Sequence, residues 1–259
     1  MNDNNFYYES NGNEGPEIES RRSPFELTST SSIFVRSYLW MFLGVLISFV
    51  SGLGFTKLLT NILINGNDTG LYIFFGVSMV SFIGQLVLCY SIRKNALFKL
   101  NFGKAFAGLI VISLLMGISF SGIFLFFEND ILYRVFGTVA IYYLVLTAIS
   151  AIFKNKVKKI EAFAAFGLVT LLICTMIVLL FSIFGGFGPL YIVVNILGLI
   201  VFSIVTIVDV QRMKRLIESA PDKKCAAVLG AFELYLDFIN IFLYVLRLLL
   251  IFGRNTRRR

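Results

Sequence analysis

The most informative segment of the chain is AFELYLDFINIFLYVLRLLL, residues 231–250. At about 1.5 Å per residue, a helix of this length spans the roughly 30 Å hydrocarbon core of a bilayer. Asp237 lies inside the segment, with apolar residues on both sides of it. A carboxylate in hydrocarbon costs roughly 2.5–3.5 kcal/mol on insertion scales, so such a residue usually faces a bundle interior or water. The segment therefore predicts a membrane helix whose buried acid has a function.

A second acid, Asp209, lies near the end of the preceding apolar run, LYIVVNILGLIVFSIVTIVD, residues 190–209. One short basic loop separates the two runs, so a helical hairpin should bring both carboxylates into the same half of the bundle. Their depths are expected to differ by about two helical turns. Two close carboxylates cannot cheaply both ionise, so the pair should share a proton at low pH. The alternative is that Asp209 is a helix-end residue paired with Arg212.

The whole chain has the composition of an integral membrane protein. Of its 259 residues, 58% are hydrophobic and 15% are charged, whereas about 25% are charged in soluble domains. The prediction is an all-α bundle of seven transmembrane helices with short connections and antiparallel neighbours. The expected spans are about 33–56, 71–92, 105–127, 132–153, 162–184, 190–211 and 228–251.

Polar segments flank the membrane domain, which is expected over residues 33–252. Residues 1–32 are rich in Asn, Glu, Ser and Gly, which is typical of a disordered tail. They contain no early apolar core, so we expect no signal peptide. Residues 253–259 form a short basic tail.

Basic residues predict the orientation of the bundle. Lysines and arginines gather before the first run and in every second loop, whereas the other loops hold only Lys57 and Arg134. By the positive-inside rule, the N-terminus and the basic loops are expected in the cytoplasm. Arg254 and the three arginines at 257–259 conflict with this topology. Either the short tail is translocated despite its charge, or the last run turns back within the membrane.

Several classes of function are disfavoured by the composition. The net charge of +8 comes from basic residues that cluster between the apolar runs, where membrane topology explains them. A nucleic-acid partner is therefore not expected. The chain has no histidine, which removes the usual metal ligand, general base and near-neutral pH switch. We expect no catalytic residues, no enzyme activity and no resident cofactor. Cys89, Cys174 and Cys225 suggest no disulfide framework.

Two motifs resemble the Bax inhibitor family, the transmembrane Bax-inhibitor-motif proteins. LYLDFINIFLYVLRLL at 234–249 resembles the family's seventh-helix signature, and FSIVTIVDVQRMKR at 202–215 resembles the end of its sixth helix. The resemblance covers roughly residues 30–252 and implies six helices around a central seventh. It also implies a pH-sensitive calcium leak, with a paired-aspartate sensor near the cytoplasmic mouth. Asp209 and Asp237 match the two sensor positions.

The resemblance also suggests roles for other residues. In prokaryotic relatives a basic residue at the cytoplasmic end of helix two pairs with the acids, and Arg93 matches that place. The alternative is that Arg93 is a positive-inside anchor at the end of its helix. Relatives can carry an acid in mid-helix two, where this chain has only Gln85 as a polar residue. Further candidates for lining a pore are Glu233, Asn240 and Arg247. Glu233 could instead sit at the interface near the helix start, and Arg247 could snorkel outward.

The function predicted is a pH-sensitive calcium or cation leak channel gated by protonation of Asp209 and Asp237, which are also candidate calcium contacts. The alternative is a non-transporting regulator in the same bilayer that binds a membrane protease or a cell-death or stress partner. The expected location is a bacterial inner membrane, or an endoplasmic-reticulum-type membrane in a eukaryote. An intramembrane aspartyl protease is disfavoured because neither aspartate is flanked by glycine.

Overall fold

The computed structural model describes residues 24–66, 68–95, 101–152, 157–183 and 188–256. Over these ranges the chain forms seven helices and no strand. The helices are α1 (Pro24–Ile64), α2 (Asp68–Asn95), α3 (Phe102–Phe124), α4 (Asn129–Ile152), α5 (Val157–Ile183), α6 (Gly188–Ser219) and α7 (Lys223–Thr256). Each contains a segment long and apolar enough to cross a membrane, so the prediction of seven transmembrane helices is confirmed.

The helices extend beyond the apolar runs that predicted them. α1 begins at Pro24, inside the segment expected to be a tail, and residues 1–23 and 257–259 of the two expected tails lie outside the described residues. α6 continues to Ser219 through VQRMKRLIES, which is rich in good helix formers. Hydropathy marks only the part of a helix that lies in lipid, whereas backbone hydrogen bonding carries the helix on into water.

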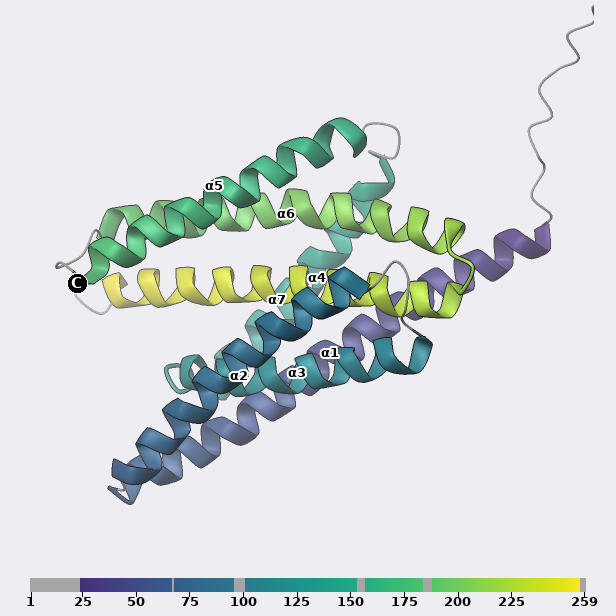
Figure 1. Ribbon diagram of the computed structural model, residues 1–259. Helices are drawn as coiled ribbons and strands as arrows, with labels where there is room; N and C mark the ends of the chain where they lie inside the picture. Colours follow the sequence, from purple (N-terminus) through teal and green to yellow (C-terminus); the bar gives the residue numbers. More distant parts are fainter. Residues whose placement is uncertain (1–23, 67, 96–100, 153–156, 184–187, 257–259) are drawn as a thin grey trace, which may run out of the picture.

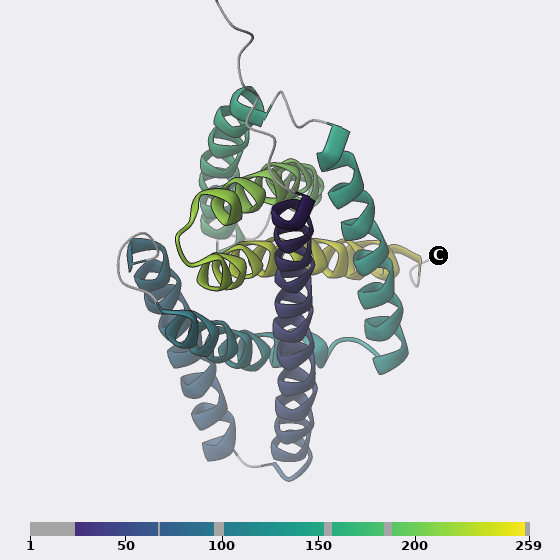
Figure 2. The ribbon, with the colours of Figure 1, turned by 90° about the vertical axis from the view of Figure 1, so that its right-hand side faces the viewer.

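α7 lies at the centre of the bundle. In its membrane-spanning window 83% of the residues are buried, against 11% in α5 and 17% in α2. It packs against α6, α1, α4 and α3, and both views show it between α6 and α3 (Figures 1 and 2). The expectation of a central seventh helix is therefore confirmed.

The neighbours in space are not always the neighbours in sequence. α4 packs chiefly on α6 and α7, and α1 packs chiefly on α3 and α7. The pairs α2–α3, α5–α6 and α6–α7 do pack on each other. In Figure 1 the ends of α2, α4 and α6 lie at the right of the bundle, together with the starts of α3, α5 and α7. This is the end at which the basic loops are expected.

Buried hydrogen bonds tie α7 to the helices around it. The Tyr235 hydroxyl lies 2.7 Å from Ser48 Oγ on α1, and Ser48 Oγ donates to the carbonyl of Ser113 on α3 at 2.8 Å. On another side, the Tyr143 hydroxyl of α4 donates to the carbonyl of Leu234 at 3.1 Å. Such bonds hold membrane helices together where apolar packing alone gives no preference for protein over lipid.

α7 is one continuous helix as far as Thr256. Of the two explanations for the basic C-terminus, the one in which the last run turns back within the membrane is therefore wrong. Cys89, Cys174 and Cys225 form no disulfide in the described part of the chain.

Candidate functional site

Close contact between α6 and α7 sets the positions of the two aspartates. A Cβ atom on Gly230 of α7 would lie only 2.3 Å from Cγ of Met213 on α6. At the other end, a Cβ atom on Gly198 of α6 would lie 2.3 Å from the ring of Tyr244 on α7. Each helix thus accepts a large side chain of the other where it has a glycine. These two contacts bracket the acidic residues along the hairpin.

The aspartates lie closer in depth than the sequence predicted. Asp209 lies ten residues before the end of α6 at Ser219, and Asp237 lies fourteen residues after the start of α7 at Lys223. In an antiparallel hairpin this offset of four residues is about 6 Å, or about one turn. The predicted offset of about two turns is wrong, because both helices extend past their apolar parts by different lengths.

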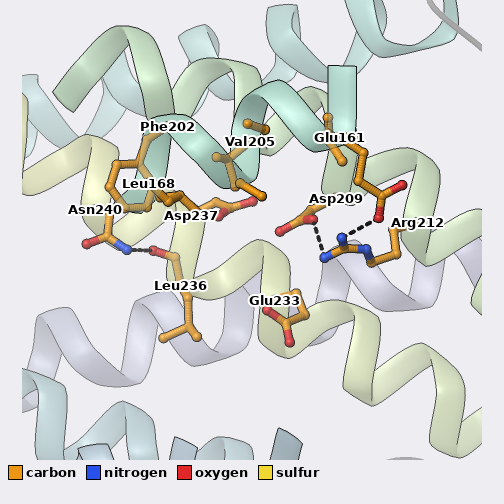
Figure 3. A pocket seen from close by; sticks show the side chains of 13 residues that line it. Glu161, Leu168, Phe202, Val205, Asp209, Arg212, Glu233, Leu236, Asp237 and Asn240 are labelled. Carbon is orange, nitrogen blue, oxygen red and sulfur yellow. Dashed lines mark hydrogen bonds and ion pairs between the residues drawn. The ribbon is translucent and has the colours of Figure 1, made fainter. Parts of the chain in front are cut away.

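Both aspartates line one cavity of about 470 Å³ between α5, α6 and α7 (Figure 3). Asp209 is 7% exposed and Asp237 is 4% exposed, so both side chains are buried in the bundle. The cavity also presents two further carboxylates, one arginine, one amide and a set of apolar side chains. Its lining is Glu161, Ala164, Ala165, Leu168, Phe202, Val205, Val208, Asp209, Arg212, Glu233, Leu236, Asp237 and Asn240. The surplus of acids makes the cavity attractive to cations.

An ion-pair network crosses the mouth of this cavity. Arg212 Nη1 lies 3.2 Å from Asp209 Oδ1, one turn earlier on the same helix. The other terminal nitrogen of Arg212 pairs with Glu161 on α5, and Arg215 Nη2 lies 3.3 Å from the second oxygen of Glu161. The pairing of Asp209 with Arg212, considered as an alternative from the sequence, is therefore present. The paired aspartate is also buried and lines the cavity, so Asp209 is both a partner of Arg212 and a member of the acidic pair.

The other predicted site residues divide into two groups. Glu233 and Asn240 line the cavity, and Asn240 Nδ2 donates to the carbonyl of Leu236 on its own helix at 2.8 Å. Arg247 does not line the cavity. It lies ten residues beyond Asp237 along α7, and its guanidinium lies 5.4 Å from the ring centre of Tyr244 in a cation–π contact.

The pairing proposed for Arg93 stays a prediction, because its side chain lies outside the described residues. The helix that carries it, α2, packs on α3 and α1. The arginine described beside Asp209 is instead Arg212 of α6. Gln85 is buried in α2, and its Oε1 has no hydrogen-bond partner within the described part of the chain.

Within the described residues, no group of three or more Asp, Glu, Cys or His side chains is arranged to hold a metal ion. Ca²⁺ takes six to eight oxygen ligands, often from carboxylates. Direct calcium contact at Asp209 and Asp237, by a transported or a bound ion, stays a prediction.

Sequence reasoning missed Glu161 as a site residue. Its signal is a single acid at the start of the fifth apolar run, two residues after Lys159 in VKKIEAF. An acid at that place is ordinary in a membrane-protein loop. Only the packing of α5 against α6 brings it to Arg212 and Arg215.

These features define a polytopic helical membrane protein with a buried acidic pair at its last hairpin. Residues 30–254 match the family described as "Inhibitor of apoptosis-promoting Bax1", and the chain belongs to this family. The resemblance seen in the two motifs is thereby confirmed. The chain is also similar to an uncharacterized protein of Borreliella burgdorferi, with 28% identity over 175 residues that cover 66% of this chain and 73% of the relative.

Proposed function

We propose that this integral membrane protein is a pH-responsive cation leak, with calcium as the ion that passes. The observation that carries the proposal is the shared cavity: Asp209 and Asp237, on successive helices, are both buried and line the same space. Buried acids in membrane helices mark ion pathways and proton relays more often than structural positions. No catalytic group is part of the proposal.

Protonation changes the charge of this cavity and the ion pairs of its wall. When Asp209 is ionised, it pairs with Arg212, whose other nitrogen holds Glu161. Protons that neutralise the carboxylates weaken these pairs and remove the charge repulsion between the acids. Acidification is therefore expected to loosen the wall of the cavity and to raise the flux of cations.

A layer of phenylalanines packs on the face of α7 opposite the acidic cavity. Phe238 follows Asp237 on α7, and together with Phe124 of α3 and Phe136 of α4 it lines a space of only about 10 Å³. This is about the volume at which a single water molecule begins to fit, so no hydrated ion passes. Phe124 also lines a cavity of about 830 Å³ at the opposite end of the bundle, beside Lys57 and Glu128. In this conformation α7 and the apolar packing around Phe238 separate the two cavities, which is expected of a closed leak pathway.

The test is calcium flux into liposomes that contain the purified protein, measured from about pH 6 to about pH 8, a window that brackets neutrality. The wild type should show a flux that rises as the pH falls, and Asp237→Asn should flatten that dependence. Glu218→Gln is the matched control, because Glu218 is an exposed acid on α6 outside the cavity. An Asp237→Asn protein with wild-type flux at every pH would contradict the proposed role of the acidic pair.

The second candidate is a regulator that does not transport ions and that binds a membrane protease or a cell-death or stress partner. The description of the family names an apoptosis-promoting target, which favours the cell-death partner among these three. Liposomes that show no flux above empty vesicles at any pH, with a protein that is folded, would favour this candidate. Deleting residues 1–30 and testing co-purification of a membrane partner would then show whether the N-terminal segment carries the binding.

A further inference from the structure

We infer that α5 is the movable wall of the acidic cavity and that Glu161 is the side chain that latches it to α6. The inference rests on the proposed function, because it says which helix moves when the acids are protonated. It is carried by three features of α5: its low burial, its limited packing, and the position of Glu161 in the ion-pair network.

α5 is the least buried of the seven helices in its membrane-spanning part, with 11% of the window buried against 28–39% in α1, α3, α4 and α6. Its main contact is with α6, and Figure 1 shows it along the outer edge of the bundle. Near the latch, Ala164 packs against Val205 and Val208. Further along, Leu171 and Val178 form a small apolar cluster with Val194 of α6 and Tyr244 of α7. These small apolar contacts leave α5 free to tilt on α6 without exposing a large core.

The helices on the other side of the cavity are tied together by hydrogen bonds. α6 is held to α4 by Gln211 Nε2, which donates to the carbonyl of Ser150 at 2.7 Å, and by the contact of 2.8 Å between Ser203 Oγ and the Tyr142 hydroxyl. α4 and α1 are in turn tied to α7. By contrast, the hydroxyls of Thr170 and Thr175 on α5 donate to carbonyls within α5 itself. Of the three helices that line the cavity, α5 is therefore the one that can move alone.

Glu161 joins α5 to α6 through both of its carboxylate oxygens, one to Arg212 and one to Arg215. The same Arg212 guanidinium holds Asp209, so one arginine connects the proposed sensor to the latch. The charged groups that face this network from α6 and α7 are Asp209, Arg212, Arg215, Glu233 and Asp237. The Glu161 side chain is 33% exposed, and the Arg212 side chain is 52% exposed, so water competes with both partners of the pair. Exposed ion pairs are weak, which suits a latch that must open.

Removing the charge of Glu161 should therefore release the start of α5 from α6. The apolar cluster that contains Leu171 and Val194 lies about three turns beyond Glu161 and would serve as the pivot. Tilting about this point widens the end of the cavity at which Glu161 lies, while α6 and α7 keep Asp209 and Asp237 in place.

The test measures the position of α5 directly. Spin labels are placed at Phe163 on α5 and Leu144 on α4, which are both 63% exposed, after Cys89, Cys174 and Cys225 have been replaced by serine. Distances between the labels are then measured by pulsed electron resonance in lipid nanodiscs at about pH 8 and about pH 4, the lower value lying near the ordinary pKa of a glutamate carboxyl group. The labelled protein should show a longer-distance population at the lower pH.

Variants of Glu161 connect that movement to the latch. Glu161→Gln should show the longer-distance population already at the higher pH, and Glu161→Asp should restore most of the wild-type behaviour. The control pair is Leu144 with Leu39 on α1, a helix joined to α4 by Tyr38 and Thr147, and its distance should not change with pH. Equal distance distributions at both pH values, or a pH response unchanged in Glu161→Gln, would overturn the inference.

This readout needs no ion flux, so its failure can be told apart from failure of the leak. Flux that depends on pH with an immobile α5 would refute the latch and leave the leak standing. Movement of α5 without flux would support the latch and refute the leak.

Discussion

α7 and α5 line the same cavity, yet they differ in mean hydropathy and most of all in how much of each helix is buried. α7 is the least apolar of the seven spans, with a mean hydropathy of 1.7 in its window, and 83% of that window is buried. α5 has a mean hydropathy of 2.2, and only 11% of its window is buried. In a bilayer the apolar solvent surrounds the protein, so apolar side chains have no preference for the interior. The polar helix goes to the centre because its acids and hydroxyls find partners there.

The largest effect is expected where a glycine of α6 receives a side chain of α7. Gly198→Ala would place a Cβ atom 2.3 Å from the Tyr244 ring and should lower the free energy of unfolding by about 1–3 kcal/mol. Thermal denaturation in detergent measures the change as a lower midpoint. Gly167→Ala on α5 is the matched control, because its nearest neighbour, Val201, lies at an ordinary 3.4 Å. Equal losses at the two positions would contradict the contrast between a tightly packed α7 and a loosely packed α5.

A smaller effect is expected at the apolar packing around Phe238. Phe238→Ala removes a ring from the apolar packing that separates the two cavities, so the flux of calcium at about pH 8 should rise about tenfold, equivalent to about 1.4 kcal/mol of barrier. Phe238→Leu should give an intermediate flux and tests whether the alanine variant fails for lack of folding. Phe166→Ala on α5 is the control, since that ring is 71% exposed. A flux that is no higher in either Phe238 variant than in the wild type would place the barrier elsewhere.

The smallest effect is expected for a single hydrogen bond of the central helix. Tyr235→Phe removes the hydroxyl that lies 2.7 Å from Ser48 Oγ and should lower the free energy of unfolding by about 0.6 kcal/mol, the average for such bonds between membrane helices. Chemical denaturation of the single variants and of the double variant with Ser48→Ala gives the coupling. Additive losses would mean that the two hydroxyls do not stabilise each other. Thr170→Val on α5, whose hydroxyl donates within its own helix, should change little.

Much of the architecture was predictable because lipid imposes a simple pattern on sequence. Each span shows as an apolar run, and the acid at Asp237 already predicted that α7 faces a protein interior. The ends of the helices were not predictable in this way, since LIES at the end of α6 is polar but helical. The relative depth of Asp209 and Asp237 was misjudged for the same reason.

The acidic pair could be identified from sequence, but its surroundings could not. Asp209 and Asp237 stand out because acids are rare in apolar runs. Glu161 does not stand out, because an acid beside a basic loop has no cost there. Its role depends on which helix packs next to α6, and neither hydropathy nor loop length carries that information. Arg247 does not line the cavity of the two aspartates, so its place along a pore stays a prediction.

The most direct test of the central claim is the pH dependence of calcium flux in liposomes for Asp209→Asn, Asp237→Asn and the double variant. If the two acids act as one sensor, each single variant should remove most of the pH dependence, and the double variant should remove little more. Glu218→Gln should keep the wild-type profile. If the effects of the single variants simply add, or if the double variant still responds to pH as the wild type does, the acidic pair is not the sensor.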